Sequence, residues 1–210
     1  MELDLQTLIP ATNKSLDKPT NSSKNLATAQ RLTEIRCRFK DVPTLLARAN
    51  VNTQTWFASR EELAVTEDFP TLAELNAAFG RNTSAAWLAV QLADLSIYTG
   101  AKNLSKRQQD QLAEIITTEF YWLKVSELLL FFHRFKTGSY GTFFGSVDPM
   151  VITCALRQFI AERNEILAQY EQQEREKRQR EYDRTHPVMT REEWMEVKTI
   201  IAMYNADYTI

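Results

Sequence analysis

The stretch of sequence that decides the fold is residues 126–136, SELLLFFHRFK. At the roughly 100° per residue of an α-helix, its apolar side chains cover most of the circumference and leave only His133 and Arg134 as a narrow polar strip. A helix with so little polar surface is typical of the centre of a bundle, so we interpret His133 as part of that strip and not as a catalytic group or ligand. The apolar residues are Leu128, Leu129, Leu130, Phe131, Phe132 and Phe135.

Helix signals continue on both sides of this stretch. Asp148 followed by Pro149 predicts the start of a long helix, because an aspartate caps the first turn and proline is tolerated directly after it. No strand-like alternation of any length and no repeat of fixed period occurs, so the sequence predicts an all-α fold, a compact helical bundle. Other helix starts are predicted by capping boxes at Ser59 with Glu62, Thr71 with Glu74, Ser105 with Gln108, and Thr190 with Glu193.

Composition divides the N-terminal part of the chain into two segments. Residues 11–28 are polar and rich in Ser, Thr, Asn and Lys, so we expect 1–28 to be a flexible N-terminal segment. A helical domain is expected over 29–170, best defined over 81–170. It ends at Tyr170, where the apolar stripe of the long helix stops.

Two further segments are expected at the C-terminal end. Residues 171–185 are predicted to be an exposed charged helix extension, because 171–181 contain no apolar residue but several oppositely charged pairs four residues apart. His186-Pro187 breaks this helix. Residues 186–210 are predicted to hold a short C-terminal amphipathic helix whose apolar residues are Trp194, Val197, Ile200, Ile201 and Tyr204.

The overall composition indicates a globular protein of a reducing compartment. The chain has 210 residues, a net charge of -2 and 44% hydrophobic residues. Two cysteines cannot form a disulfide framework, and the first residues lack the basic start and apolar run of a signal peptide. The longest apolar run, residues 128–132, is far shorter than the roughly 20 residues that span a bilayer. A cytoplasmic location is therefore expected, without a membrane partner.

Residue patterns for catalysis, metal binding or nucleotide binding are weak. Cys37, His133, Cys154 and His186 are isolated from one another, unlike metal ligands. The cluster of Gly138, Gly141 and Gly145 lacks the Gly-Lys-Ser/Thr ending of a phosphate-binding loop, and it follows a predicted helix instead of a strand. Cys154 has no histidine near it in sequence, so we interpret it as an inert thiol. We therefore expect no enzyme, no catalytic residue, no metal and no cofactor.

The positive signal is the segment after the apolar helix, where three of the five glycines occur. Gly138, Gly141 and Gly145 predict a flexible connection between two helices. Its aromatic rings either fold back into the bundle or form a contact surface for a partner or for stacked bases. The candidate partner-binding residues are Arg134, Lys136, Tyr140, Phe143 and Phe144.

Several motifs carry a resemblance to known proteins. They are Trp87 with the helix after Ser105, ELLLFF from Glu127, FKTGSYG from Phe135, VDP from Val147 and FIAER from Phe159. With these motifs, residues 87–163 are similar to a family of small all-α proteins carried by bacteriophages and mobile elements of gut bacteria, which has no settled biochemical function. The architecture, a compact helical domain with a charged helical tail, also resembles small non-ATPase helicase loaders of phage primosomes.

Three functional hypotheses remain open. The first is a non-enzymatic protein-interaction adaptor, an accessory of DNA replication or mobile-element maintenance, whose partner is a protein such as a helicase. The second is a single-stranded nucleic-acid-binding protein that uses the candidate residues above, although a pI near 5.8 disfavours nucleic acid. The third is a structural or oligomerising protein in which the stripe from Ile152 to Tyr170 pairs with another chain.

Overall fold

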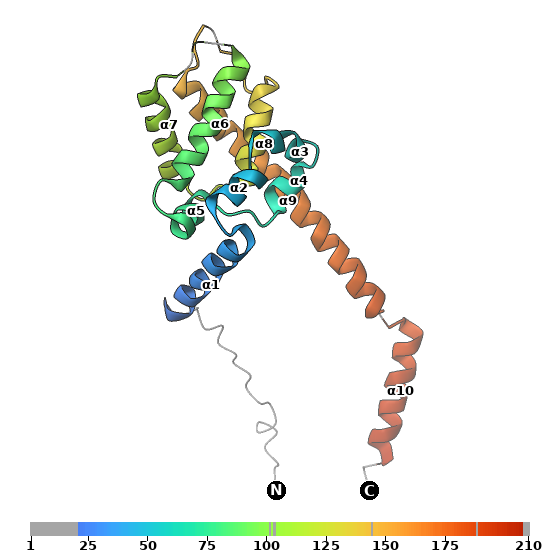
Figure 1. Ribbon diagram of the computed structural model, residues 1–210. Coiled ribbons are helices and arrows are strands. Elements are labelled where there is room, and N and C mark those ends of the chain that lie inside the picture. Colours follow the sequence, from blue (N-terminus) through green and yellow to red (C-terminus); the bar gives the residue numbers. More distant parts are fainter. Residues whose placement is uncertain (1–20, 101, 103, 144, 188, 208–210) are drawn as a thin grey trace.

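The computed structural model describes residues 21–207 except 101, 103, 144 and 188. Within these residues the chain is all-α, as predicted, and only two isolated β-bridges accompany the helices (Figure 1). The elements are α1 (Asn21–Phe39), α2 (Val42–Arg48), the 3₁₀ turn η2 (Val51–Thr53), α3 (Gln54–Ala58), α4 (Glu61–Thr66), α5 (Leu72–Phe79), α6 (Thr83–Thr99), α7 (Lys106–Glu119), α8 (Val125–Lys136), α9 (Pro149–Thr185) and α10 (Arg191–Asp207).

Helix α8 is the centre of the bundle, which confirms the prediction from its apolar circumference. Residues 128–132 are fully buried, and α3, α4, α6 and α9 all contact this helix. A single apolar core runs from Ile35 to Phe159 around it. We use the name head for residues 21–170, which contain this core.

Three of the four predicted capping boxes are present. At Thr71, Ser105 and Thr190 the hydroxyl accepts an N3 backbone N–H and the N3 side chain accepts the cap N–H. The box at Ser59 is wrong: α4 begins one residue later, after Arg60, without a side-chain cap. The Ser59 hydroxyl instead donates to the Trp56 carbonyl, 2.9 Å away, so it satisfies the end of α3.

The N-terminal part of the head differs from the expected flexible segment 1–28. Helix α1 already begins at Asn21, and residues 1–20 lie outside the described residues. A polar composition favoured a flexible segment, but Asn and Ser are also favourable at helix N-termini, and the Ala, Leu, Gln and Arg residues that follow are good helix formers. Polarity alone therefore does not distinguish the first turn of an exposed helix from a loop.

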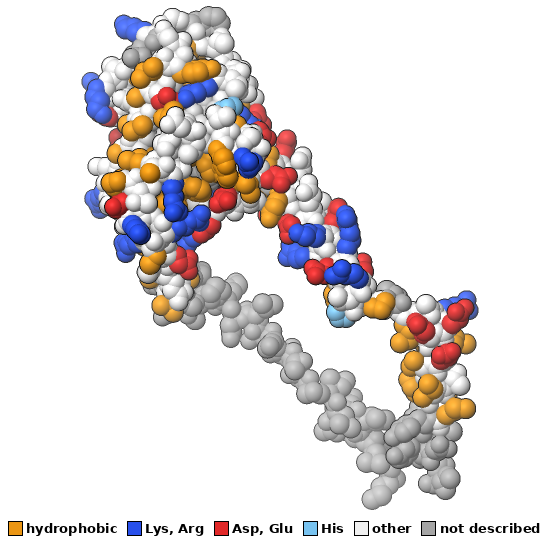
Figure 2. Space-filling view, turned by 45° about the vertical axis from the view of Figure 1, so that its right-hand side comes forward, with side chains coloured by type: hydrophobic (Ala, Val, Ile, Leu, Met, Phe, Trp, Pro, Cys, Tyr) orange, Lys and Arg blue, Asp and Glu red, His pale blue; other side chains and the backbone are white. Residues whose placement is uncertain are grey.

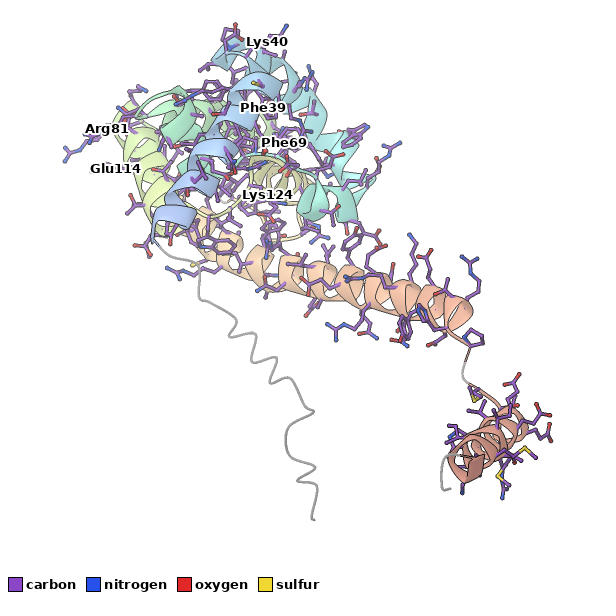
Figure 3. All side chains as sticks on the ribbon, turned by 90° about the horizontal axis from the view of Figure 1, so that it is seen from below. Phe39, Lys40, Phe69, Arg81, Glu114 and Lys124 are labelled. Atoms are coloured by element: carbon purple, nitrogen blue, oxygen red, sulfur yellow. The ribbon has the colours of Figure 1, made fainter. Side chains whose placement is uncertain are left out.

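Helix α1 is fixed to the head by an aromatic contact and a group of ion pairs. Phe39 is fully buried, and its ring centroid lies 5.7 Å from that of Phe69, next to which Figure 3 shows it. Arg31 contacts both Asp68, at 2.6 Å, and Glu74, at 3.1 Å. These contacts join α1 to α5 and to the segment before it.

The long helix α9 belongs partly to the head and partly to solvent. Its first turns bury Ile152, Ala155, Leu156 and Phe159 in the core. Residues 171–185 continue the same helix away from the head, and we call them the arm (Figure 1). At about 1.5 Å per residue the arm extends about 22 Å. The helix ends at Thr185, directly before the predicted break.

Helix α10 follows the arm and does not dock on the head. Every side chain described in α10, residues 191–203, is exposed. Figure 2 shows mixed positive and negative side chains on the arm, and apolar side chains beside acidic ones on α10. Among the described residues, the apolar side chains of α10 are therefore not covered by the head.

Candidate interaction surfaces

The glycine segment is a helix-to-helix connection, as predicted, and it is attached to the head at both ends. Gly138 has a φ of +84° and donates its N–H to the Phe135 carbonyl at 3.0 Å, which closes α8 with a residue that tolerates positive φ. Near the other end, Lys102 donates its N–H to the Gly145 carbonyl, also at 3.0 Å. The Asp148 carboxylate then accepts the Met150 N–H and starts α9.

The aromatic rings that the structure describes in this connection fold back onto the bundle. Tyr140 stacks against Phe131 with 5.7 Å between ring centroids, and its hydroxyl donates to Glu162 at 2.8 Å. Burial, followed by the hydrogen bond to Glu162, raises the pKa of Tyr140 well above its ordinary value. Phe143 stacks on Phe135 at 5.2 Å. Phe144, the third predicted ring, lies outside the described residues.

The two cations of the predicted site are also held by partners inside the head. Arg134 forms ion pairs of 2.7 Å with Glu61 of α4 and with Glu162 of α9. Lys136 pairs with Asp94 of α6. Both side chains therefore link α8 to neighbouring helices, and their charges are balanced by carboxylates. These contacts favour the interpretation of Arg134, Lys136, Tyr140 and Phe143 as structural anchors over that of an open contact surface.

A buried ion pair near the first turn of α8 was missed by sequence reasoning. Glu127 is fully buried, and its carboxylate accepts from Arg163 at 2.8 Å and from the Lys124 N–H at 2.9 Å. The Arg163 guanidinium also lies 5.5 Å from the centre of the Trp122 ring. The two charged residues are 36 positions apart, so only packing brings them together.

Aromatic and arginine side chains form a partly exposed surface around this ion pair. Tyr121 and Trp122 are 55% and 38% exposed and Arg157 is exposed, whereas Phe120 is buried and the Arg163 side chain is 16% exposed. The Arg157 guanidinium lies 5.7 Å from the centre of the Phe120 ring, and the Arg163 guanidinium lies 5.5 Å from the centre of the Trp122 ring. We call this set of five residues the aromatic–arginine surface. Trp, Tyr and Arg are the residue types enriched at protein-interaction hot spots. The Phe-Tyr-Trp run at 120–122 is the sequence signal that could have indicated it.

The second exposed surface is α10. Trp194, Val197 and Ile201 are 53%, 39% and 54% exposed. Spacings of three and four residues place them on one side of the helix. Isolated exposed apolar residues are ordinary, but a row of them along a helix is characteristic of interaction sites. Further exposed apolar residues of α10 are Met195, Ile200 and Met203.

The described residues include neither a cluster of metal ligands nor a membrane-spanning helix. None of their His, Cys, Asp and Glu side chains gather in a group of three or more that could hold a metal ion. Cys37 and Cys154 are both exposed free thiols. No helix in the described part of the chain is long and apolar enough to cross a membrane.

Comparison with known proteins gives one match. No curated protein and no solved structure matches the chain. The matched region begins before α7 and extends through the glycine connection and the arm into α10. Residues 103–203 match the model of DUF6633, a family of unknown function.

Proposed function

We propose that this protein is a non-enzymatic interaction adaptor that binds another polypeptide through α10. The observation that carries the proposal is the row of exposed apolar side chains on α10, which the arm places away from the head. Burial of a fully exposed apolar side chain gains about 1.5–3 kcal/mol, and these side chains, which are about half exposed, would each gain roughly half of that when a partner covers them.

Charge supports a protein partner over a lipid surface. The sequence of α10 contains two basic and four acidic residues. Helices that lie on membranes typically carry lysine and arginine on the polar face, because the lipid surface is negative. The acidic balance of α10 opposes such binding.

The aromatic–arginine surface gives the head a second place for contact. It lies on the α7–α8 loop and on α9, so it is separate from α10. An adaptor needs two surfaces that can be occupied together, and a stiff linker between them sets the distance. The arm is a continuous helix and provides this linker.

The partner class that we propose is a protein of DNA replication or mobile-element maintenance. This part of the proposal rests on the resemblance to phage-borne proteins and to helicase loaders. We do not propose direct binding of single-stranded nucleic acid, because Arg134 and Lys136 are paired with carboxylates and Tyr140 is packed against the core.

Crosslinking in cells tests the proposal. Lys198 lies beside the apolar row, so an amine-reactive crosslinker should join it to another polypeptide. The crosslink should be lost with Ile201→Asp and kept with Met203→Asp, a matched change on the opposite side of α10. If Lys198 crosslinks only to the head of its own chain, the adaptor proposal is wrong. If deleting the gene leaves the copy number of the genetic element that carries it unchanged, the partner is not a replication or maintenance protein.

A further inference from the structure

The apolar row of α10 has the spacing of a two-stranded coiled coil. Trp194, Val197 and Ile201 are separated by three and then four residues, and the sequence continues with Tyr204 three positions later. This is the alternation of a and d positions in a heptad repeat. Valine and isoleucine at such positions are compatible with a helix pair. The row is therefore better suited to pairing with another helix that has a heptad row than to binding a flat protein surface.

We infer that α10 pairs, in parallel, with α10 of a second copy of this chain. The inference rests on the proposed function of α10 as a binding helix. It assigns a second copy of this chain to α10 and leaves the aromatic–arginine surface of the head for the replication or maintenance protein. In the heptad defined by Trp194 and Val197, Glu193 is a g position and Lys198 an e position. Parallel pairing places each Glu193 beside the Lys198 of the other copy, which gives two symmetric ion pairs.

The observed side chains are compatible with this arrangement. The Lys198 ammonium lies 5.1 Å from the centre of the Trp194 ring, at the edge of the apolar row. Glu193 uses Oε2 to accept the Thr190 N–H at 2.7 Å, which holds the carboxylate at the other edge. An antiparallel pair centred on the same row would instead place Lys198 beside Lys198 of the second copy. Charge therefore selects the parallel orientation.

The size of the interface sets the expected strength of pairing. Helix α10 has 17 residues, slightly more than two heptads. Isolated helices of about this length are marginal in water, and short interfaces belong to the weak, reversible class. We expect a dimer that forms at micromolar concentrations. Such a dimer would carry two heads on neighbouring arms, which makes the adaptor bivalent.

This arrangement replaces the pairing surface that the sequence suggested. The stripe that begins at Ile152 was the candidate for contact with another chain. Residues Ile152 and Phe159 are fully buried in the head, so that part of the stripe is not available. Pairing through α10 needs no change in the head.

The first test is the mass of the full chain in solution. Sedimentation equilibrium or light scattering from about 1 to 300 µM should show conversion from the 24.3 kDa monomer to a dimer. Ile201→Asp should weaken the dimer about 100-fold or more, because burial of an apolar side chain is lost in both copies. Met203→Asp, with the same new charge on the opposite side, should leave the dissociation constant within about threefold.

The second test is orientation. In a background of Cys37→Ser and Cys154→Ser, Val197→Cys should form an intermolecular disulfide with itself, because equivalent d positions face each other only in a parallel pair. Lys198→Glu should weaken the dimer by placing like charges beside Glu193. Lys198→Glu mixed with Glu193→Lys should form mixed dimers in preference to either homodimer.

The outcomes distinguish this inference from the proposed function. A monomer at all concentrations, or a dimer indifferent to Ile201→Asp, overturns pairing through α10. If Lys198 then still crosslinks to a different protein in cells, α10 is a binding helix with another partner and the adaptor proposal stands. A dimer that fails to form the Val197→Cys disulfide but responds to Ile201→Asp overturns the parallel orientation.

Discussion

The glycine connection and α10 both contain aromatic residues, but their surroundings are opposite. The connection follows α8 and contains Tyr140 and Phe143, and α10 follows α9 and contains Trp194. In the glycine connection, Tyr140 and Phe143 pack on Phe131 and Phe135. In α10, Trp194 and Ile201 are more than half exposed. The same residue types therefore serve as an anchor in one region and as a free surface in the other.

The difference lies in the chain around each segment. The glycine connection joins two helices that contact each other, α8 and α9, so its rings are delivered to the core. Helix α10 follows an arm that leaves the core, so its side chains have no neighbouring helix. An aromatic residue therefore indicates an interaction surface only when the structure shows that it lies away from the core.

The largest expected effect separates the two regions by stability. Phe131→Ala should lower the free energy of unfolding by about 3–5 kcal/mol, because a fully buried ring in contact with four aromatic neighbours is removed. Trp194→Ala should change it by less than about 0.5 kcal/mol at monomeric concentrations. Urea denaturation followed by circular dichroism measures both. Equal losses would mean that α10 packs on the head.

The second prediction concerns the ion pair between the buried Glu127 and Arg163 of the aromatic–arginine surface. Arg163→Met should destabilise the head by about 2–4 kcal/mol, because the Glu127 carboxylate loses its arginine while remaining buried. The double variant Glu127→Gln with Arg163→Met should recover part of this loss in the same denaturation experiment. A double variant as unstable as the two single changes added together would show that the two side chains act independently.

A smaller effect is expected at the tyrosine of the glycine connection. Tyr140→Phe keeps the ring but removes the hydroxyl that donates to Glu162, so stability should fall by about 1 kcal/mol. Tyr121→Phe is the matched control, because its side chain is 55% exposed. Thermal denaturation compares the two. A Tyr140→Phe variant as stable as the control would place the hydroxyl in solvent.

The smallest predicted effect is a pH dependence from His133. Burial, followed by the charge of Lys136, lowers the pKa of this histidine below its ordinary value of 6.5. The unfolded chain therefore takes up a proton at a higher pH than the folded chain. Stability should be full above about pH 6.5 and should fall as the pH decreases toward the lowered pKa. His133→Gln should flatten this slope in urea titrations from pH 7 to 5, and His186→Gln should not.

Much of the fold could be predicted because its signals are local. The apolar circumference of residues 126–136, the Asp148 cap and three capping boxes each depend on residues within a few positions. The start of α1 was missed because polar composition is compatible with an exposed helix. The capping box at Ser59 was wrongly predicted because a serine between two helices can bond either a carbonyl at the end of the first helix or an N–H at the start of the second.

The candidate site could be predicted less well, because exposure is not a local property. The rings near Gly138 and the cations Arg134 and Lys136 were the most conspicuous residues in the sequence, and the structure uses them to hold α8 against α4, α6 and α9. The aromatic–arginine surface combines residues from the α7–α8 loop with two arginines of α9. No spacing in the sequence connects them.

The sequence by itself determined the all-α class, the central helix, the glycine connection and the helical arm with its break, since each follows from periodicity, capping or backbone freedom. The tertiary structure alone decided which aromatic residues are exposed. Tyr140 and Phe143 face inward because α8 and α9 provide partners within reach, and α10 faces solvent because a charged helix, whose residues 171–181 include no apolar side chain, separates it from the core. Burial depends on neighbours distant in sequence, and those neighbours exist only once the chain has packed.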